Sequence, residues 1–316
     1  MLTTLRDLCQ QYFDAEEKER TVNYEDLFFA ASQLQEHLSQ EYENPVVEPF
    51  ARNILNRLRG CKGRDQLREI TELACSYITD VVALELSANS MARAPLACLV
   101  EAVRDTAFEG CDVFTLNHDV LIERSLAEAS VTFVDGFGAA DGDVSWWNPE
   151  LLNRTSRTYV LKLHGSISWA RYDGRLAKVL GPDRDHARTH DGELLGIPDR
   201  AGLLIGTFNK IRDYFRQPYF ELFATLRRQM AKITSLLISG YSFGDKGINA
   251  VLTEWMYTGD QRRLIVLHAD GSRCIARARG AIRNLRQRFD GSRMLVHPSH
   301  LCDCSWQTLR RQLCIR

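Results

Sequence analysis

The sequence predicts an α/β fold, a Rossmann-like parallel sheet with helices on both faces, preceded by a mainly helical N-terminal segment. Two observations support this prediction. From Cys111 onward, short apolar runs alternate with amphipathic stretches, as in strand–helix–strand units with right-handed crossovers. Before Cys111 only helical periodicity is found. We therefore expect two parts: residues 1–110, a helical segment packed on the core as an incomplete start of the Rossmann fold, and residues 111–316, the Rossmann-like core.

The N-terminal helices are predicted from apolar residues at helical spacing. They cover residues 24–38, 50–58, 65–86 and 95–110. Pro95 suits the first turn of the last helix, because the N–H that proline lacks has no partner within that turn.

The core elements are predicted from the alternation that follows. Leucine-rich or β-branched runs predict strands at 112–116, 131–134, 159–163, 202–206, 234–239, 263–268 and 294–297. Helices are predicted at 119–129, 212–231, 246–258 and 274–289. The polar stretch 171–200 is punctuated by glycine and proline, and we expect it to be an insertion.

Composition limits the class of protein. The 316 residues are 45% hydrophobic and 26% charged, as in an ordinary globular protein. A net charge of −1 gives no global electrostatic basis for binding nucleic acid. Nine arginines gather between residues 262 and 293, and they can form a solvated helix face or meet an anionic partner.

The sequence also predicts a cytoplasmic location. No apolar run reaches the ~18 residues of a membrane span, and the start lacks the pattern of a signal peptide. Nine cysteines at irregular spacing fit reduced thiols better than a disulfide framework.

Three predicted strands end in small polar residues. The segments are 113–119 (VFTLNHD), 159–166 (YVLKLHGS) and 236–245 (LLISGYSFGD). Ligands bind outside the carboxyl ends of the strands in an open parallel sheet. The three strand ends therefore predict one shared cleft.

The residue types at these ends suit nucleotide chemistry. The amide of Asn117 can hold a ribose hydroxyl or orient a water, and histidine, here His164, is the usual proton acceptor near neutral pH. Gly240 allows close approach of a phosphate or ribose, beside a hydroxyl at Ser242. Each also has a structural interpretation: a turn, a hydrogen-bonded histidine, or a sterically required small residue. Asp119 in turn can cap the following helix.

In this order, followed by Ile248 and Asn249, the motifs resemble the sirtuin-like domain of many bacterial proteins. That family includes NAD-consuming modules of anti-phage defence, and the resemblance covers about residues 20–270. It implies that Asn117 and Asp119 lie beside the nicotinamide end of NAD and that His164 is the general base. The remaining residues assigned to NAD binding are Thr115, Gly165, Ser166, Gly240, Tyr241, Ser242 and Asp245.

The chain departs from the family pattern in two places. No cysteine occurs between His164 and Cys274, so no zinc is expected. The first glycine is Gly60, so we expect the N-terminal Gly-rich phosphate loop, and the central strand before it, to be missing.

The resemblance thus predicts a hydrolase that cleaves NAD to nicotinamide and ADP-ribose, with a role in anti-phage defence. One alternative is an inactive module that binds NAD or ADP-ribose or acts through interaction; a third is an NAD-dependent protein deacylase. The expected partners are NAD or ADP-ribose and a second copy or a defence complex, without a membrane.

Two clusters of potential metal ligands would suggest a metal site instead. They are Asp183, His186 and His190 in the predicted insertion, and His297, His300, Cys302 and Cys304 near the end of the chain. The first lacks a fourth ligand and the second lacks the usual zinc spacing, so no metal site is predicted.

Overall fold

The structure is a computed structural model that describes residues 1–15, 21–39, 45, 47–58, 61–89, 96–153, 156–181, 183, 185–196, 198, 202–205, 217–278 and 280–313. The helices are α1 (Leu2–Ala15), α2 (Tyr24–Leu38), α3 (Val47–Arg57), α4 (Arg64–Asn89), α5 (Ala97–Arg104), α6 (Leu121–Glu128), α8 (Tyr219–Lys232), α9 (Lys246–Tyr257), α10 (Gly271–Arg277), α11 (Gly280–Phe289), α12 (Trp306–Leu313), and the 3-10 turns η1 (Pro149–Asn153) and η2 (Leu301–Asp303). The strands are β1 (Val113–Thr115), β2 (Phe137–Asp141), β3 (Val144–Trp147), β4 (Val160–Lys162), β5 (Trp169–Tyr172), β6 (Arg175–Val179), β7 (Ser235–Ser239), β8 (Arg263–Leu267) and β9 (Met294–His297).

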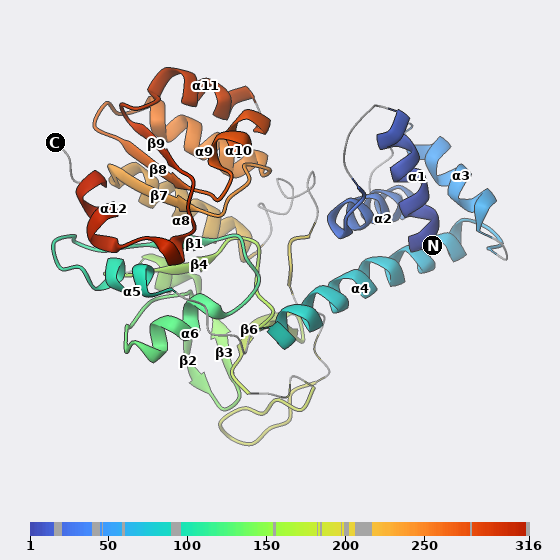
Figure 1. Cartoon of the computed structure of the whole chain (residues 1–316). Helices are drawn as coiled ribbons and strands as arrows, with labels where there is room; N and C mark the ends of the chain where they lie inside the picture. Colours follow the sequence, from blue (N-terminus) through green and yellow to red (C-terminus); the bar gives the residue numbers. More distant parts are fainter. Residues whose placement is uncertain are drawn as a thin grey trace.

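Parallel strands with helices on both faces form the core, as predicted (Figure 1). β1 pairs with β4, and β8 lies between β7 and β9. Successive side chains of β8 point to opposite faces. Leu264 and Val266 join a cluster with α8, α9, α10 and α11, whereas Ile265 and Leu267 pack with α5 and α12.

The parallel strands form two separate sheets within the described residues, because β1 and β7 do not pair with each other. The two strands nevertheless line the same cavity. Asp112 lies just before β1, and burial raises the pKa of its carboxyl group. The hydrogen bond from the Tyr159 N–H, and to a smaller extent the charge of Lys232 shortly before β7, partly offset that rise. A cavity of about 1960 Å³ is lined by residues 112–119 and 233–242, so it follows both strands along their length.

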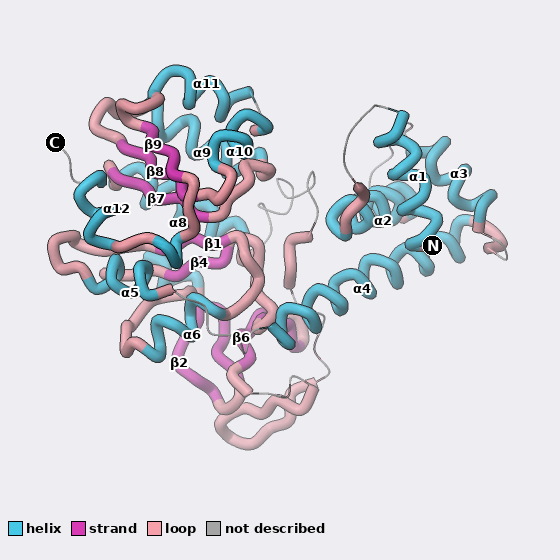
Figure 2. Tube along the Cα trace, viewed as in Figure 1, coloured by secondary structure: helices cyan, strands magenta, loops and turns pink. Residues whose placement is uncertain are grey.

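A four-stranded antiparallel sheet was not predicted. Its order is β2-β3-β6-β5, and it lies at one end of the core in Figure 2. Its strands take up part of the stretch predicted as an insertion. The predicted strand at 131–134 is wrong, since only Val134 forms an isolated bridge, to Tyr159. In the predicted strand 202–206, Leu203 bridges Gly165, and residue 206 lies outside the described residues.

Three predicted helices have different bounds. The stretch 274–289 is divided into α10 and α11, and α8 begins at Tyr219, while residues 212–216 of the predicted helix lie outside the described residues. The helix predicted at 95–110 is α5, which ends at Arg104, and Pro95 lies outside the described residues. Helix α1 lies within the segment predicted as mainly helical, but no bounds were predicted for a helix before residue 24.

The first helices have a hydrophobic cluster of their own. Leu5 of α1, Leu34 of α2, Ile54 of α3 and Leu67 of α4 are almost fully buried in it. Figure 1 shows α1, α2 and α3 beside one end of the long helix α4, away from the sheets. The division at residue 110 stays a prediction. None of the described helices is both long enough and apolar enough to cross a membrane.

Candidate active site

Side chains from the ends of β1, β4 and β7 lie on one cavity. The residues predicted for the site that line it are Thr115, Asn117, Asp119, His164, Gly240, Tyr241, Ser242 and Asp245. Gly165 and Ser166 are buried and are not among the lining residues. The strand ends therefore converge, as expected for the carboxyl edge of parallel strands.

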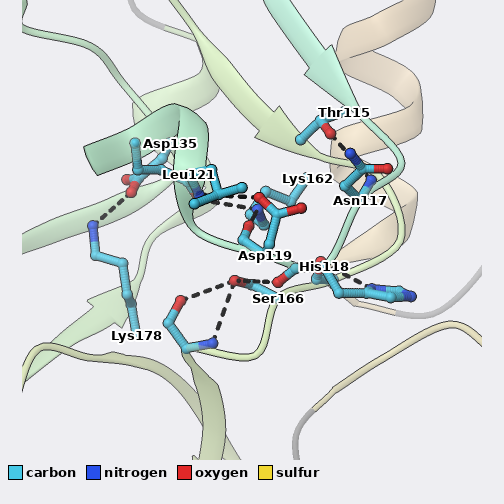
Figure 3. Close-up of polar contacts among 12 residues, drawn as sticks. Thr115, Asn117, His118, Asp119, Leu121, Asp135, Lys162, Ser166 and Lys178 are labelled. Atoms are coloured by element: carbon cyan, nitrogen blue, oxygen red, sulfur yellow. Dashed lines mark hydrogen bonds and ion pairs between the residues drawn. The ribbon is translucent and has the colours of Figure 1, made fainter. Parts of the chain in front are cut away.

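The β1 end is shaped by side chains that bond to the backbone (Figure 3). Thr115 Oγ1 accepts the N–H of Asn117 at 3.1 Å, and Asp119 Oδ1 accepts the N–H of Leu121, the first residue of α6, at 3.0 Å. The amide of Asn117 is exposed at the cavity. Asp119 thus stabilises the start of a helix, which matches the structural interpretation of this residue.

Lys162 of β4 contacts the turn that follows β1. Its ammonium donates to the carbonyl oxygen of Asp119 and is 3.2 Å from Glu123 Oε1, and the lysine side chain is only 4% exposed. A buried ammonium needs such partners. Lys162 therefore ties the β1 turn to β4, so that Asn117 and His164 come from a connected pair of strands.

The turn after β4 depends on glycine. Gly165 has φ +84°, and a Cβ added there would lie 1.9 Å from the carbonyl oxygen of Gly202. The N–H of Leu204 donates to the His164 carbonyl at 2.9 Å. The Ser166 hydroxyl bonds to Ser168 Oγ at 3.0 Å, so it stabilises this turn.

His164 and Asp245 form a buried pair. Nε2 of His164 is 3.0 Å from Oδ2 of Asp245, and their side chains are 4% and 6% exposed. The pair joins the end of β4 to the loop after β7. Sequence reasoning placed Asp245 among the NAD-binding residues, but in the structure its carboxylate contacts the histidine.

The loop after β7 is held by its own hydrogen bonds. The hydroxyl of Tyr241 accepts the N–H of Asp245 at 3.2 Å and lies 3.0 Å from Asn249 Oδ1. Phe243 is buried with φ +57°, a conformation rare outside glycine. Gly240, with φ +68°, has no heavy atom within 4 Å of an added Cβ, so its cavity side is open.

The N–H groups of Gly247 and Ile248 at the N-terminus of α9 are taken up by the helix cap. Asp245 Oδ1 accepts the N–H of Gly247 at 2.8 Å and of Ile248 at 3.0 Å. The sequence had suggested that this helix start favours an anion. Gly240 and Ser242, which were also predicted for ligand binding, line the cavity.

His118 is a site residue that sequence reasoning missed. It lines the cavity, and its ring centroid is 6.4 Å from that of His164. Its Nδ1 lies 3.4 Å from the Gly165 carbonyl oxygen. The sequence signal was available, since His118 stands between Asn117 and Asp119.

The potential metal ligands remain dispersed. His186 Nδ1 bonds to Asp183 Oδ2 at 2.9 Å on the exposed surface, and the backbone N–H of His190 bonds to Asp141. No group of three or more histidine, cysteine or acidic side chains that could hold a metal ion is found in the part of the chain that the structure describes.

Comparison with known proteins adds one match. A family model for the SIR2-like domain matches residues 112–287, more than half of the 316 residues. The matched span contains all three strand ends that line the cavity. No curated protein matches the chain significantly.

Proposed function

Because the chain belongs to the family of SIR2-like domains, which use NAD, we propose that it hydrolyses NAD to nicotinamide and ADP-ribose. The observation that supports this best is the convergence of Asn117 and His164 on one cavity. The cavity extends beyond the strand ends to residues of α1, α2 and α4, and its volume of about 1960 Å³ exceeds the roughly 300–1,000 Å³ of typical ligand pockets, so its size does not exclude a dinucleotide.

The proposed reaction depends more on the positioning of the ribose and the water than on a strong acid catalyst. The bond from C1′ of ribose to the pyridinium nitrogen breaks, and its electron pair leaves with nicotinamide, which becomes neutral. A water oxygen bonds to C1′, and its proton is released to a base. Asn117 would orient the water or the ribose, and His164 would accept the proton.

The other end of the dinucleotide would lie over the β7 loop. Gly240 leaves open space there, and Ser242 is exposed with a hydroxyl at the cavity. A glycine without neighbouring atoms allows a phosphate or ribose to approach the backbone closely.

Nicotinamide release from NAD by the purified chain tests the proposal. We expect release by the wild type and a loss of about 100-fold or more in Asn117→Ala and His164→Ala, since each removes one proposed group. His186→Ala, an exposed histidine outside the cavity, should keep wild-type activity. A silent wild type, no different from Asn117→Ala, would refute hydrolysis by this chain.

An inactive module that binds NAD or ADP-ribose is the second candidate. The separation of β1 from β7 favours it, because a site between unpaired strands is less well fixed than one on a continuous sheet. Calorimetry that finds tight ADP-ribose binding without nicotinamide release would favour this candidate.

We also propose a setting in anti-phage defence, in the cytoplasm, with a second copy or a defence complex as partner. The support is the family resemblance of the three motifs. If so, phage should form fewer plaques on cells that express the chain than on control cells, and the Asn117→Ala variant should restore the number of plaques.

A further inference from the structure

We infer that Asp245 is a positioning residue for His164: its carboxylate accepts the Nε2 proton and fixes the tautomer and place of the imidazole at the cavity. The inference rests on the proposed function in assigning His164 to the chemistry. It gives Asp245 a role other than contact with NAD.

One carboxylate serves two elements. Oδ2 faces His164 Nε2 at 3.0 Å, while Oδ1 accepts the N–H groups of Gly247 and Ile248. The start of α9 therefore holds the carboxylate, and the carboxylate holds a histidine that is 81 positions away in the sequence. A carboxylate fixed through one oxygen offers the other in a single direction.

The loop around Asp245 is fixed as well. The N–H of Asp245 donates to the Tyr241 hydroxyl, and the Asn249 amide nitrogen donates to the Phe243 carbonyl at 2.8 Å. Asn249 is 4% exposed and Phe243 is 1% exposed, so these bonds lie inside the protein, where they resist competition from water. The carboxylate is thus preorganised before any ligand binds.

The pairing decides which imidazole nitrogen is basic. A neutral imidazole has one N–H and one acceptor nitrogen. A carboxylate accepts only, so it selects the tautomer with the proton on Nε2 and the lone pair on Nδ1. It also stabilises the imidazolium that forms when His164 takes up a proton.

Two substitutions separate this role from the cap. Asparagine and serine are as good as aspartate at the start of a helix, so Asp245→Asn and Asp245→Ser keep the cap of α9. Both remove the negative charge from His164. Glu48→Gln is the matched control, since Glu48 Oε2 pairs with His37 Nε2 at 2.7 Å among the N-terminal helices.

The experiment combines kinetics with the nitrogen resonances of the histidine rings, with His164 assigned by His164→Gln. In the wild type we expect His164 protonated on Nε2; in Asp245→Asn and Asp245→Ser we expect a mixture of tautomers. For nicotinamide release, both variants should lower kcat by about 100-fold with KM for NAD within twofold. Glu48→Gln should change neither quantity.

Two results would overturn the inference: a wild-type tautomer of His164 in both Asp245 variants, or a wild-type kcat in both. If the wild-type chain releases no nicotinamide, the proposed hydrolysis fails on its own. The ring resonances then still decide whether Asp245 sets the tautomer.

Discussion

At the scale of the residue, Gly165 is the position beside His164 that tolerates least change. Its φ of +84° and the 1.9 Å approach of a Cβ to the Gly202 carbonyl both exclude a side chain. We expect Gly165→Ala to lower the free energy of unfolding by about 3 kcal/mol. Gly174→Ala, at φ +76° with no heavy atom within 4 Å, should cost only about 1 kcal/mol. Denaturant titrations measure both, and equal losses would contradict the steric explanation.

Buried thiols give the stability a pH dependence. Burial raises the pKa of Cys75 to about 12 and that of Cys111 to about 11, from 9.0. The folded chain keeps these protons above pH 9 while the unfolded chain releases them. Stability should therefore fall as the pH rises from 9 to 11. Denaturation midpoints at several pH values measure this fall, and a Cys75→Ala, Cys111→Ala double variant should show a smaller one.

At the scale of the element, helix α2 begins at a capping box. Asn23 Oδ1 accepts the N–H of Asp26, and Asp26 Oδ2 accepts the N–H of Asn23, each at 3.1 Å. Asn23→Ala should lower the free energy of unfolding of the N-terminal helices by about 1 kcal/mol, and Asn23→Ser should restore most of it. Far-UV circular dichroism during denaturation tests this. Nicotinamide release should be unchanged, since the capping hydrogen bonds of Asn23 lie at the start of α2 and involve none of the residues predicted for the site.

Elements with long periodic or strongly apolar sequences were predictable. Helices α2 and α4 and strands β7 and β8 lie close to their predicted bounds, because each has a clear period or an apolar run. The antiparallel strands were missed because their sequences lack a continuous aliphatic run and are interrupted by turns such as that at Gly174.

The site divides in the same way. Residues at strand ends could be predicted to meet, because the carboxyl edges of parallel strands coincide. The pairing of His164 with Asp245 could not, because a motif contains no information on which atoms face each other across 81 positions. His118 was missed because it stands between Asn117 and Asp119, and no role was assigned to the residue between these two motif positions.

At the scale of the whole molecule, no described strand pairs with the edge of β7 that faces β1. Gly240 N–H bonds to Leu267 O of β8, so by alternation the Ser239 N–H points away from β8. Open edges promote association between copies. We expect the chain to self-associate with concentration in sedimentation experiments, and Ser239→Pro, which removes an N–H without a partner in the sheet, to weaken this.

Ile238→Pro is the matched control for that variant. The Ile238 N–H points toward β8, so its loss should destabilise the fold. If Ser239→Pro associates as strongly as the wild type, the open edge is not the contact between copies.

The two separate parallel sheets should also change the usual pattern of amide hydrogen exchange, in which central strands exchange most slowly. The N–H groups of Val113 and of Gly240 bond to neighbouring strands, so those of Phe114 and Leu237 point into the cavity. Along β7 the exchange rates should therefore alternate, with Leu236 and Ile238 slow and Leu237 and Ser239 fast. Among the parallel strands, deuterium should therefore enter first at the N–H groups of β1 and β7 that face the cavity.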